Sequence, residues 1–281
     1  MTIPFLNLQN LKPLGITREG IVAFTDGTNT VKPNQTQCEA YGFKYDKVTG
    51  TCTAFTFNEN LERSLINENN NIQGSGNVTE GGTNNTYIMG EDNTVKGLSR
   101  NNIVIGSKNQ IDRNVNNTFV YGTFGQSTAD NSIVLGGNAS TDNLGKRQSI
   151  QLIYGVKTTA GSTVDSYLNN ITNSFLVIPD NTIMYFHADV VAVRVGGSAE
   201  EGNVGDYASW VERGVVINKS GTLSVNRERD AIKSNGTVTD WRPTANVSGT
   251  NFRMTVRGET NTDIEWCSNI TFTQIKTGVS L

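Results

Sequence analysis

A phrase written five times between residue 65 and about residue 143 constrains the fold of this chain more than any other feature. Each copy places an asparagine five residues before a glycine and a β-branched residue two before it. The glycines, spaced 16, 16, 16 and 14 residues apart, are Gly74, Gly90, Gly106, Gly122 and Gly136. The asparagines are Asn69, Asn85, Asn101, Asn117 and Asn131, and the β-branched residues are Ile72, Ile88, Val104, Val120 and Val134. A fixed period with several aligned columns predicts stacked structural repeats.

Each copy predicts one short strand, and both faces of that strand are apolar. Alternate side chains of a strand point to opposite faces. The β-branched column therefore faces one way. The residue before each glycine and the residue three before it face the other way, as in the pairs Tyr87 with Met89, Ile103 with Ile105, Phe119 with Tyr121 and Ile133 with Leu135. A stack of coils covers one face with its own core, so we expect the other to pack against copies of the same chain.

The glycines permit a tight corner after each strand, and the asparagines suit positive φ and ladders between coils. The copy at residues 131–140 resembles the head-domain repeat of trimeric autotransporter adhesins, which also occurs in bacteriophage tail fibres. The resemblance covers about 75 residues and implies a left-handed parallel β-roll shared by three chains. The first copy departs from the pattern at Asn71 and Gln73, where we expect a polar cap.

The composition favours an extended, surface-rich, all-β protein. The 281 residues allow two or three domains; 36% are hydrophobic and 17% are charged. The net charge is −3 and the basic residues are scattered, so we expect no nucleic-acid partner. No apolar run is long enough to span a membrane, and residues 1–7 lack the features of a secretory signal. We therefore expect no membrane insertion, synthesis in a host cytoplasm and a place in a virion.

We divide the chain into four segments. Residues 1–37 are interpreted as an extended virion-attachment arm, with a flexible tail as the alternative. Residues 38–66 form a small two-cysteine β-hairpin module and a short neck, residues 67–148 the roll, and residues 149–281 a C-terminal β-sandwich. Cys38 and Cys52 either form a disulfide, which would close a 15-residue loop, or remain two reduced thiols in a small core.

After residue 148 the strands become longer and the turns irregular. We expect strands at residues 150–156, 174–178, 182–195, 208–217, 222–226, 237–241, 251–256, 263–266 and 270–275. That number of strands with polar turns predicts an antiparallel sandwich. The order of anchors at 175–182, 190–194, Trp241, 252–258 and 264–266 is similar to a C-terminal β-domain of phage tail-fibre and appendage proteins. The resemblance implies a virion protein without identifying a receptor.

The sequence gives little support for catalysis. His187 is the single histidine, and we interpret it as a packed or interface residue rather than a general base. Asp189, Glu200, Glu201 and Asp206 are acidic, but their spacing singles out no pair of catalytic carboxylates. No glycine is followed by the lysine and hydroxyl residue of a phosphate loop, and no metal-ligand set is present. We expect no catalytic residues, no metal and no cofactor.

Binding is the function that remains. The candidate receptor-binding residues are Tyr207, Trp210, Arg227 and Arg229; we place Trp210 near the surface and Trp266 in the core. Arg227 and Arg229 stand in a charged loop with Glu228 and Asp230, for which a solvated turn is the simpler interpretation.

We expect a homotrimeric phage tail fibre that attaches to tail or capsid proteins through its N-terminus and binds a host-surface glycan or protein through its C-terminal domain. The alternatives are a capsid head fibre or decoration protein, and a tailspike that degrades polysaccharide.

Overall fold

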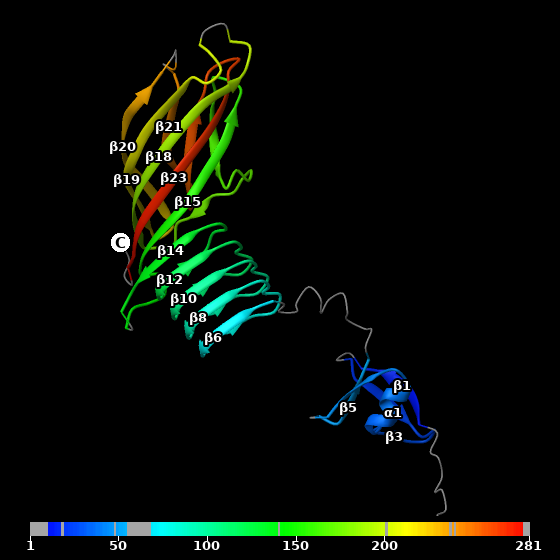
Figure 1. Ribbon diagram of the computed structural model, residues 1–281. Helices are drawn as coiled ribbons and strands as arrows, with labels where there is room; N and C mark the ends of the chain where they lie inside the picture. The colour runs from blue at the N-terminus through cyan, green and yellow to red at the C-terminus, as the bar shows by residue number, and fades with distance from the viewer. Residues whose placement is uncertain are drawn as a thin grey trace, which may run out of the picture. The chain divides into compact units, whose positions relative to one another are not determined.

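The computed structural model describes residues 11–17, 20–47, 49–54, 69–139, 141–199, 202–235, 238 and 240–277. The chain forms two compact units, Met1–Ser64 and Leu65–Leu281 (Figure 1). The expected neck at 58–66 and the first ten residues of the expected arm lie outside the described residues. Within the described ranges, no helix has the length and apolar character needed to cross a bilayer.

The first unit is built from short strands around one short helix. Its three-stranded antiparallel sheet runs in the order β1 (Lys12–Ile16), β2 (Val22–Thr25) and β3 (Thr30–Val31). Helix α1 (Gln35–Ala40) follows, and β4 (Lys44–Asp46) pairs antiparallel with β5 (Thr51–Thr53) as the expected hairpin. The helix begins with a capping box, because Asn34 accepts a hydrogen bond from the Gln37 backbone N–H while the Gln37 side chain accepts one from Asn34.

A small core joins residues on both sides of position 37. Val22 and Phe24 pack with Cys38 and Cys52, which form a disulfide. The extended arm expected for 1–37 is therefore wrong for residues 11–17 and 20–37, which fold with the two-cysteine segment, while its role in attachment stays a prediction. The reason is that Phe24 contacts the rings of Tyr41 and Phe43, so its core is completed by apolar residues of the following segment.

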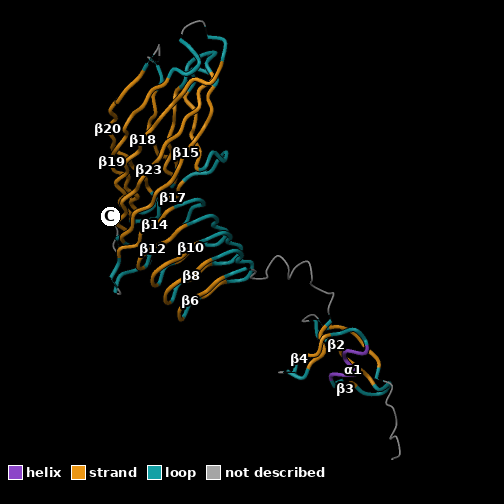
Figure 2. Tube along the Cα trace, in the orientation of Figure 1, coloured by secondary structure: helices purple, strands orange, loops and turns teal. Residues whose placement is uncertain are grey.

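The roll forms as predicted, with one strand per sequence copy. The five strands are parallel and in register: β6 (Asn71–Ser75), β8 (Tyr87–Glu91), β10 (Ile103–Ser107), β12 (Phe119–Thr123) and β14 (Ile133–Gly137). A second parallel ladder closes the coils: β7 (Val78–Thr79), β9 (Thr94–Val95), β11 (Gln110–Ile111) and β13 (Gln126–Ser127). Figure 2 shows the coils stacked side by side, with loops at their corners.

The repeated residues have the roles that their chemistry predicts. The β-branched column is buried from Ile88 to Val134, while Ile72 in the first coil is exposed. The asparagine column has φ between 52° and 57°, a conformation that asparagine tolerates better than most residues. Gly90 has φ +137°, and a Cβ there would stand 1.8 Å from the carbonyl oxygen of Gly106. Glycine is required at this corner because the next coil's backbone occupies the side-chain position.

The C-terminal part continues the roll's sheet. β14 pairs antiparallel with β15 (Arg147–Thr158), which is followed across the sheet by β23 (Asp263–Lys276), β18 (Thr182–Gly196), β19 (Tyr207–Lys219) and β20 (Thr222–Ser234). A second antiparallel layer contains β16 (Thr163–Leu168), β17 (Leu176–Val177), β21 (Arg242–Ser248) and β22 (Asn251–Arg257).

The two layers share an aromatic core. The Phe252 ring, from β22, lies 5.0 to 6.2 Å from the rings of Phe272, Phe186 and Tyr154, which come from three strands of the larger sheet. Trp266 stacks on Trp210 with ring centroids 5.6 Å apart. The prediction of an all-β chain, with a parallel roll followed by antiparallel sheets, is confirmed.

Several strand boundaries differ from those expected. The strands expected at 263–266 and 270–275 are one strand, β23, because Ser268 faces the core and both neighbouring strands pair through the intervening residues. β16 was not expected. In the strand expected at 237–241, the described residues Val238, Asp240 and Trp241 precede β21 instead of forming a strand. The charged loop expected at residues 227–230 lies inside β20, where its alternating charges point to opposite faces.

Candidate binding surfaces

One sheet runs unbroken through ten strands from β6 to β20, and its two faces differ in chemistry. We call the face opposite the β-branched column the outer face. One register row on it is Gln73, Met89, Ile105, Tyr121, Leu135, Ser149, Thr273, Tyr185, Val215 and Asn226. The adjacent row is Asn71, Tyr87, Ile103, Phe119, Ile133, Gln151, Thr271, His187, Arg213 and Glu228.

The roll part of the outer face is apolar and uncovered in the single chain. The side chains exposed by 40 to 52% are Met89, Ile103, Tyr121, Ile133 and Leu135. Large apolar side chains of this kind are usually buried in a folded protein. A contiguous patch of them at the surface marks an interaction surface. The second apolar face that the sequence predicted is therefore present, and no element among the described residues packs on it to remove it from solvent.

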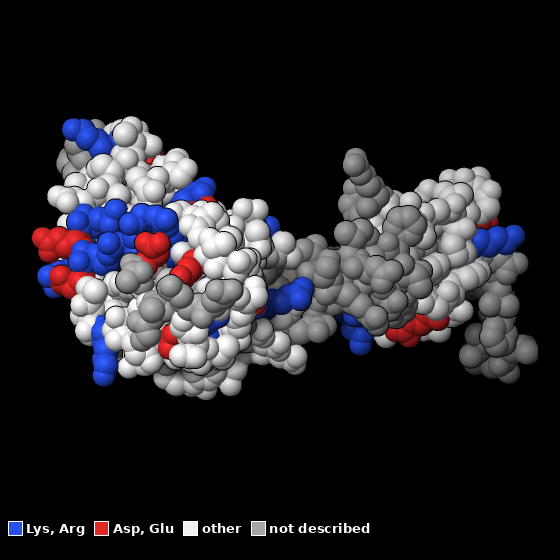
Figure 3. All heavy atoms as spheres, turned by 90° about the horizontal axis from the view of Figure 1, so that it is seen from above, with Lys and Arg blue, Asp and Glu red and all other residues white. Residues whose placement is uncertain are grey.

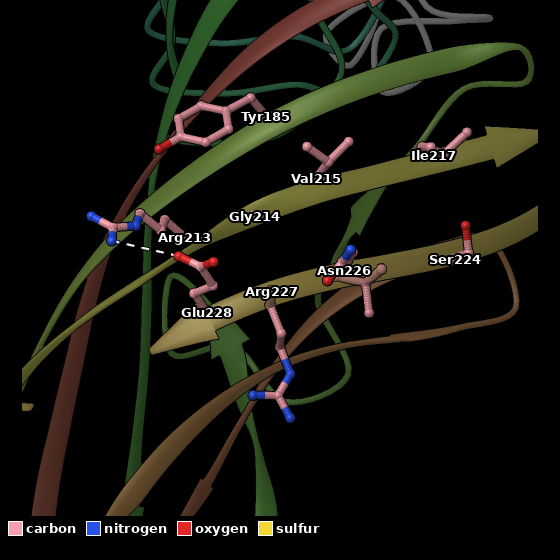
Figure 4. A pocket seen from close by; sticks show the side chains of 10 residues that line it. Tyr185, Arg213, Gly214, Val215, Ile217, Ser224, Asn226, Arg227 and Glu228 are labelled. Atoms are coloured by element: carbon pink, nitrogen blue, oxygen red, sulfur yellow. Dashed lines mark ion pairs between the residues drawn. The ribbon is translucent and has the colours of Figure 1, made fainter. Parts of the chain in front are cut away.

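Across β18, β19 and β20 the outer face is hollowed and carries both polar and apolar side chains. A hollow of about 700 Å³ is lined by Tyr185, Arg213, Val215, Asn226 and Glu228, among others. Figure 4 shows Tyr185 and Arg213 on the same side of the sheet, with the Arg213–Glu228 ion pair, whereas Arg227 points away from them. His187 lies half-exposed on this face with Nε2 3.2 Å from Asp189 Oδ1, so the expected packed position is wrong and the expected interface position stays a prediction.

A second hollow, of about 420 Å³, lies where β20 approaches the edge of the smaller layer, and we call it the arginine hollow. Its lining is entirely polar: Thr163, Arg227, Arg229, Arg242, Thr244, Asn246 and Thr255. Arg242, Thr244 and Asn246 alternate along β21 and so share its solvent face. Figure 3 shows Lys and Arg side chains gathered on one face of the second unit, with acidic side chains at the border of the group.

Two of the arginines are held in place by their neighbours. Arg227 Nη1 donates a hydrogen bond to Glu212 Oε1 at 3.1 Å, and the Ala245 backbone N–H donates to the same oxygen at 2.8 Å. Arg229 Nη1 donates to the Pro243 carbonyl oxygen at 2.7 Å. Burial raises the pKa of the Glu212 carboxyl, while the Ala245 N–H and the charges of the two arginines act in the opposite direction.

The four candidate receptor-binding residues do not form one site. Arg227 and Arg229 are exposed and line the arginine hollow. Tyr207 is half-buried at the start of β19, and its backbone N–H donates to Asn235 Oδ1 at 2.6 Å. Trp210 is buried against Trp266, so the expectation of a surface position is wrong. Its alternation with the buried Ala208 and Glu212 is the signal that places it on the inner face.

Arg242 was not predicted as a site residue. Arg242, Thr244 and Asn246 follow one another at intervals of two residues, which is the pattern of a solvent-facing strand column, but the strand was expected to end before Arg242. Among the acidic candidates, Asp206 accepts a hydrogen bond from the Asn203 backbone N–H, while Glu200 and Glu201 lie outside the described residues. In the described ranges, no group of three or more histidine, cysteine or acidic side chains is placed to hold a metal ion.

Comparisons with known proteins give distant structural likeness. No protein-family model matches the chain, and no curated protein matches it. The tailspike protein of Acinetobacter baumannii phage AM24 matches with a TM-score of 0.29 at 9% identity, over 75% of this chain and 50% of that chain. A tailspike protein from Acinetobacter baumannii bacteriophage Fri1, described as a capsular polysaccharide depolymerase, matches with a TM-score of 0.26 at 8% identity, over 74% and 45%.

A protein of Bacillus endospore appendages, which form disulfide-linked pili, matches with a TM-score of 0.18 at 14% identity, over 49% of this chain and 98% of that chain. The chain spans about half the length of the two tailspikes. TM-scores of this size assign no common fold, so the proposals below depend on the residues of the chain itself.

Proposed function

We propose that the protein is a virion structural protein: a homotrimeric phage tail fibre that attaches to the particle by its N-terminus and binds the host surface by its C-terminal domain. The observation that carries the proposal is the exposed apolar row from Met89 to Leu135 on the roll. The proposed fibre acts without catalysis, cofactor or metal. Its specificity for the host surface comes from contacts of the C-terminal layers.

The partner on the apolar row is a second copy of the chain. The row repeats its side chains once per coil, at the strand spacing of about 4.8 Å. A partner must offer apolar groups at that same rise, and a copy of the roll does so because its register is identical. The resemblance of the repeat to rolls shared by three chains supports three copies. Three identical C-terminal domains would then allow weak contacts with a surface to add by avidity.

Light scattering on the purified chain tests the assembly. We expect a molar mass of about three times the 30.5 kDa chain mass. Leu135→Glu places a charge at a side chain that is 52% exposed, so the chain should fold but lose the trimer. Val204→Glu is the matched control, because Val204 is 67% exposed in a loop away from the row, and its mass should stay unchanged. A wild-type mass of a single chain would contradict the proposal.

A capsid head fibre or decoration protein is the second candidate, because the same domains would serve if the N-terminal unit gripped capsid. Immunogold electron microscopy of intact particles separates the two, since label at the tail supports the fibre and label over the capsid supports the alternative. Loss of chain length in a surface polysaccharide on incubation with the purified protein would instead identify a depolymerising tailspike.

A further inference from the structure

We infer that the arginine hollow binds the anionic group of an acidic saccharide, which would be the host-surface ligand class of the C-terminal domain. The inference builds on the proposed function and names its ligand chemistry. It is carried by the charge, the shape and the hydrogen-bonding groups of the hollow formed by β16, β20, β21 and β22.

Positive charge in the hollow exceeds the negative charge that faces it. Arg227, Arg229 and Arg242 line it, and among the described residues the acidic side chain that forms an ion pair with one of them is Glu212. Asp165, on neighbouring β16, forms an ion pair with Arg253 at 2.6 Å. Glu228 and Asp230 alternate with the arginines on β20, and they pair with Arg213 on the outer face. The nearby acids therefore leave the hollow with excess positive charge, which an incoming anion would compensate.

Arg242 is the arginine with unused binding capacity. Its side chain is exposed and forms no ion pair or hydrogen bond with any residue in the described part of the chain. Its register partner on β22 is Arg257, so a further cation lies beside it. Guanidinium groups bind carboxylate, sulfate and phosphate through paired hydrogen bonds, and two of the three here are already oriented by Glu212 and Pro243.

The rest of the lining fits sugar hydroxyls. Thr244 Oγ1 donates to the Pro243 carbonyl oxygen at 2.8 Å, and Thr255 Oγ1 donates to the Thr244 carbonyl oxygen at 3.0 Å. Each hydroxyl therefore donates its hydrogen bond within the protein, and its oxygen remains able to accept a hydrogen bond from a ligand. Asn246 and Thr163 add an exposed amide and hydroxyl at the rim. A volume of about 420 Å³ is that of a small-ligand site.

A saccharide fits this lining better than a nucleic acid. Single-stranded nucleic acids are held by aromatic side chains on which the bases stack. No aromatic residue lines the arginine hollow, and the nearby Trp210 and Trp241 are buried in the core. Anionic groups and hydroxyls are the features that the hollow can read, and an acidic sugar carries both.

The test measures binding of the full-length protein to defined polymers immobilised on a biosensor. Alginate supplies carboxylates, dextran sulfate supplies sulfates, and dextran is the neutral polymer. Polyglutamate carries negative charge without sugar hydroxyls, and oligo(dT) carries negative charge together with bases. We expect an apparent Kd for alginate or dextran sulfate at least about tenfold below that for dextran, polyglutamate and oligo(dT). The preferred acidic polymer identifies the anionic group.

Arg229→Gln and Arg242→Gln together should weaken that binding by at least about tenfold and reduce its salt dependence, because two charge-assisted contacts are lost. Arg113→Gln is the matched control; this arginine is 65% exposed on the roll, and binding should stay within about twofold of wild type. The variants must keep the wild-type molar mass and melting temperature. Arg242→Gln alone serves if the double variant does not, because Arg242 has no partner to lose.

Unchanged binding in the double variant would overturn the inference, as would equal affinity for dextran, polyglutamate or oligo(dT). Those outcomes do not contradict the proposed trimeric fibre, because its test is the molar mass, which is measured on the same samples. A single-chain mass would contradict the fibre instead, and the dependence of binding on Arg229 and Arg242 could still be measured.

Discussion

The side-chain amide of Asn109 donates a hydrogen bond to the carbonyl oxygen of Gly122, in the next coil of the roll, at 2.8 Å. Asn77 and Asn93 make the same bond to Gly90 and Gly106, also at 2.8 Å. Glycine and asparagine of the repeat are thus coupled, since each glycine turns a corner that exposes a carbonyl group and the asparagine of the preceding coil binds it.

Asn109→Ala should lower the free energy of unfolding by about 2 to 4 kcal/mol, because the half-buried Gly122 carbonyl and the buried Gly125 N–H both lose their partner. Urea unfolding followed by circular dichroism measures it. Asn77→Ala is the matched control at the end of the roll, where the half-buried side chain is close to water, and it should cost less than half as much. Equal losses at the two positions would contradict a role that depends on burial.

Gly106→Ala should prevent the coils from stacking. Gly106 has φ +120°, and a Cβ would stand 2.0 Å from the Gly122 carbonyl oxygen, so we expect a loss of about 4 kcal/mol or more. Limited proteolysis should then cut within the roll. Gly137→Ala is the control, because a Cβ there meets nothing within 4 Å, and its stability should lie within about 1 kcal/mol of wild type. A Gly106→Ala chain as resistant as wild type would rule out the close contact.

Glu212 should make the stability of the second unit depend on pH. Its pKa is raised by burial above the ordinary value of 4.5, so the folded state binds the proton more tightly than the unfolded state. The stabilisation is complete below that ordinary value and is lost as the pH rises through the raised value. The stability of wild type relative to Glu212→Gln should therefore fall as the pH rises above the ordinary carboxyl value of 4.5.

The corresponding control is Glu228→Gln, because Glu228 is exposed on the outer face and pairs with Arg213. Thermal unfolding at each pH gives the comparison, and the Glu228→Gln chain should follow the wild-type profile. Parallel profiles for wild type and Glu212→Gln would show that the buried carboxyl does not titrate in this range.

Loss of the disulfide should destabilise the first unit and spare the second. The Cys38–Cys52 bond closes a short loop, so replacing both cysteines by serine should cost about 3 kcal/mol. Calorimetry should show the first unit's transition moving down while the larger transition stays. Cys267→Ser serves as control, since Cys267 is free and exposed. Dithiothreitol should reproduce the double substitution in wild type, and a reductant-insensitive transition would be inconsistent with the bond.

The roll was predictable because its period, its buried column and its corner residues are all local in sequence. Val104 and Gly106 could be assigned from five aligned copies, and the exposed row followed from strand alternation. The first unit was harder, because the core around Phe24 is completed by residues of a later segment that has no repeated pattern.

The binding residues were partly predictable. Arg227 and Arg229 were named, but the hollow depends on Arg242, which reaches them because β20 lies beside β21. Trp210 was misplaced for a related reason: a tryptophan after a loop could face either side, and the packing of Trp266 decides which. Register across strands distant in sequence, rather than composition, determined both outcomes.

The pairing of β14 with β15 has a mechanical consequence. Four consecutive residue pairs, from Ile133 with Gln151 to Gly136 with Gln148, join the stacked coils to the C-terminal sheet. A pull along the stacking direction would load the backbone hydrogen bonds between successive strands in series. The stack of coils would therefore resist only as much force as its weakest strand pair. The asparagine side-chain bonds between coils carry part of the same force. The stack would begin to open at the first coil, whose Ile72 is exposed.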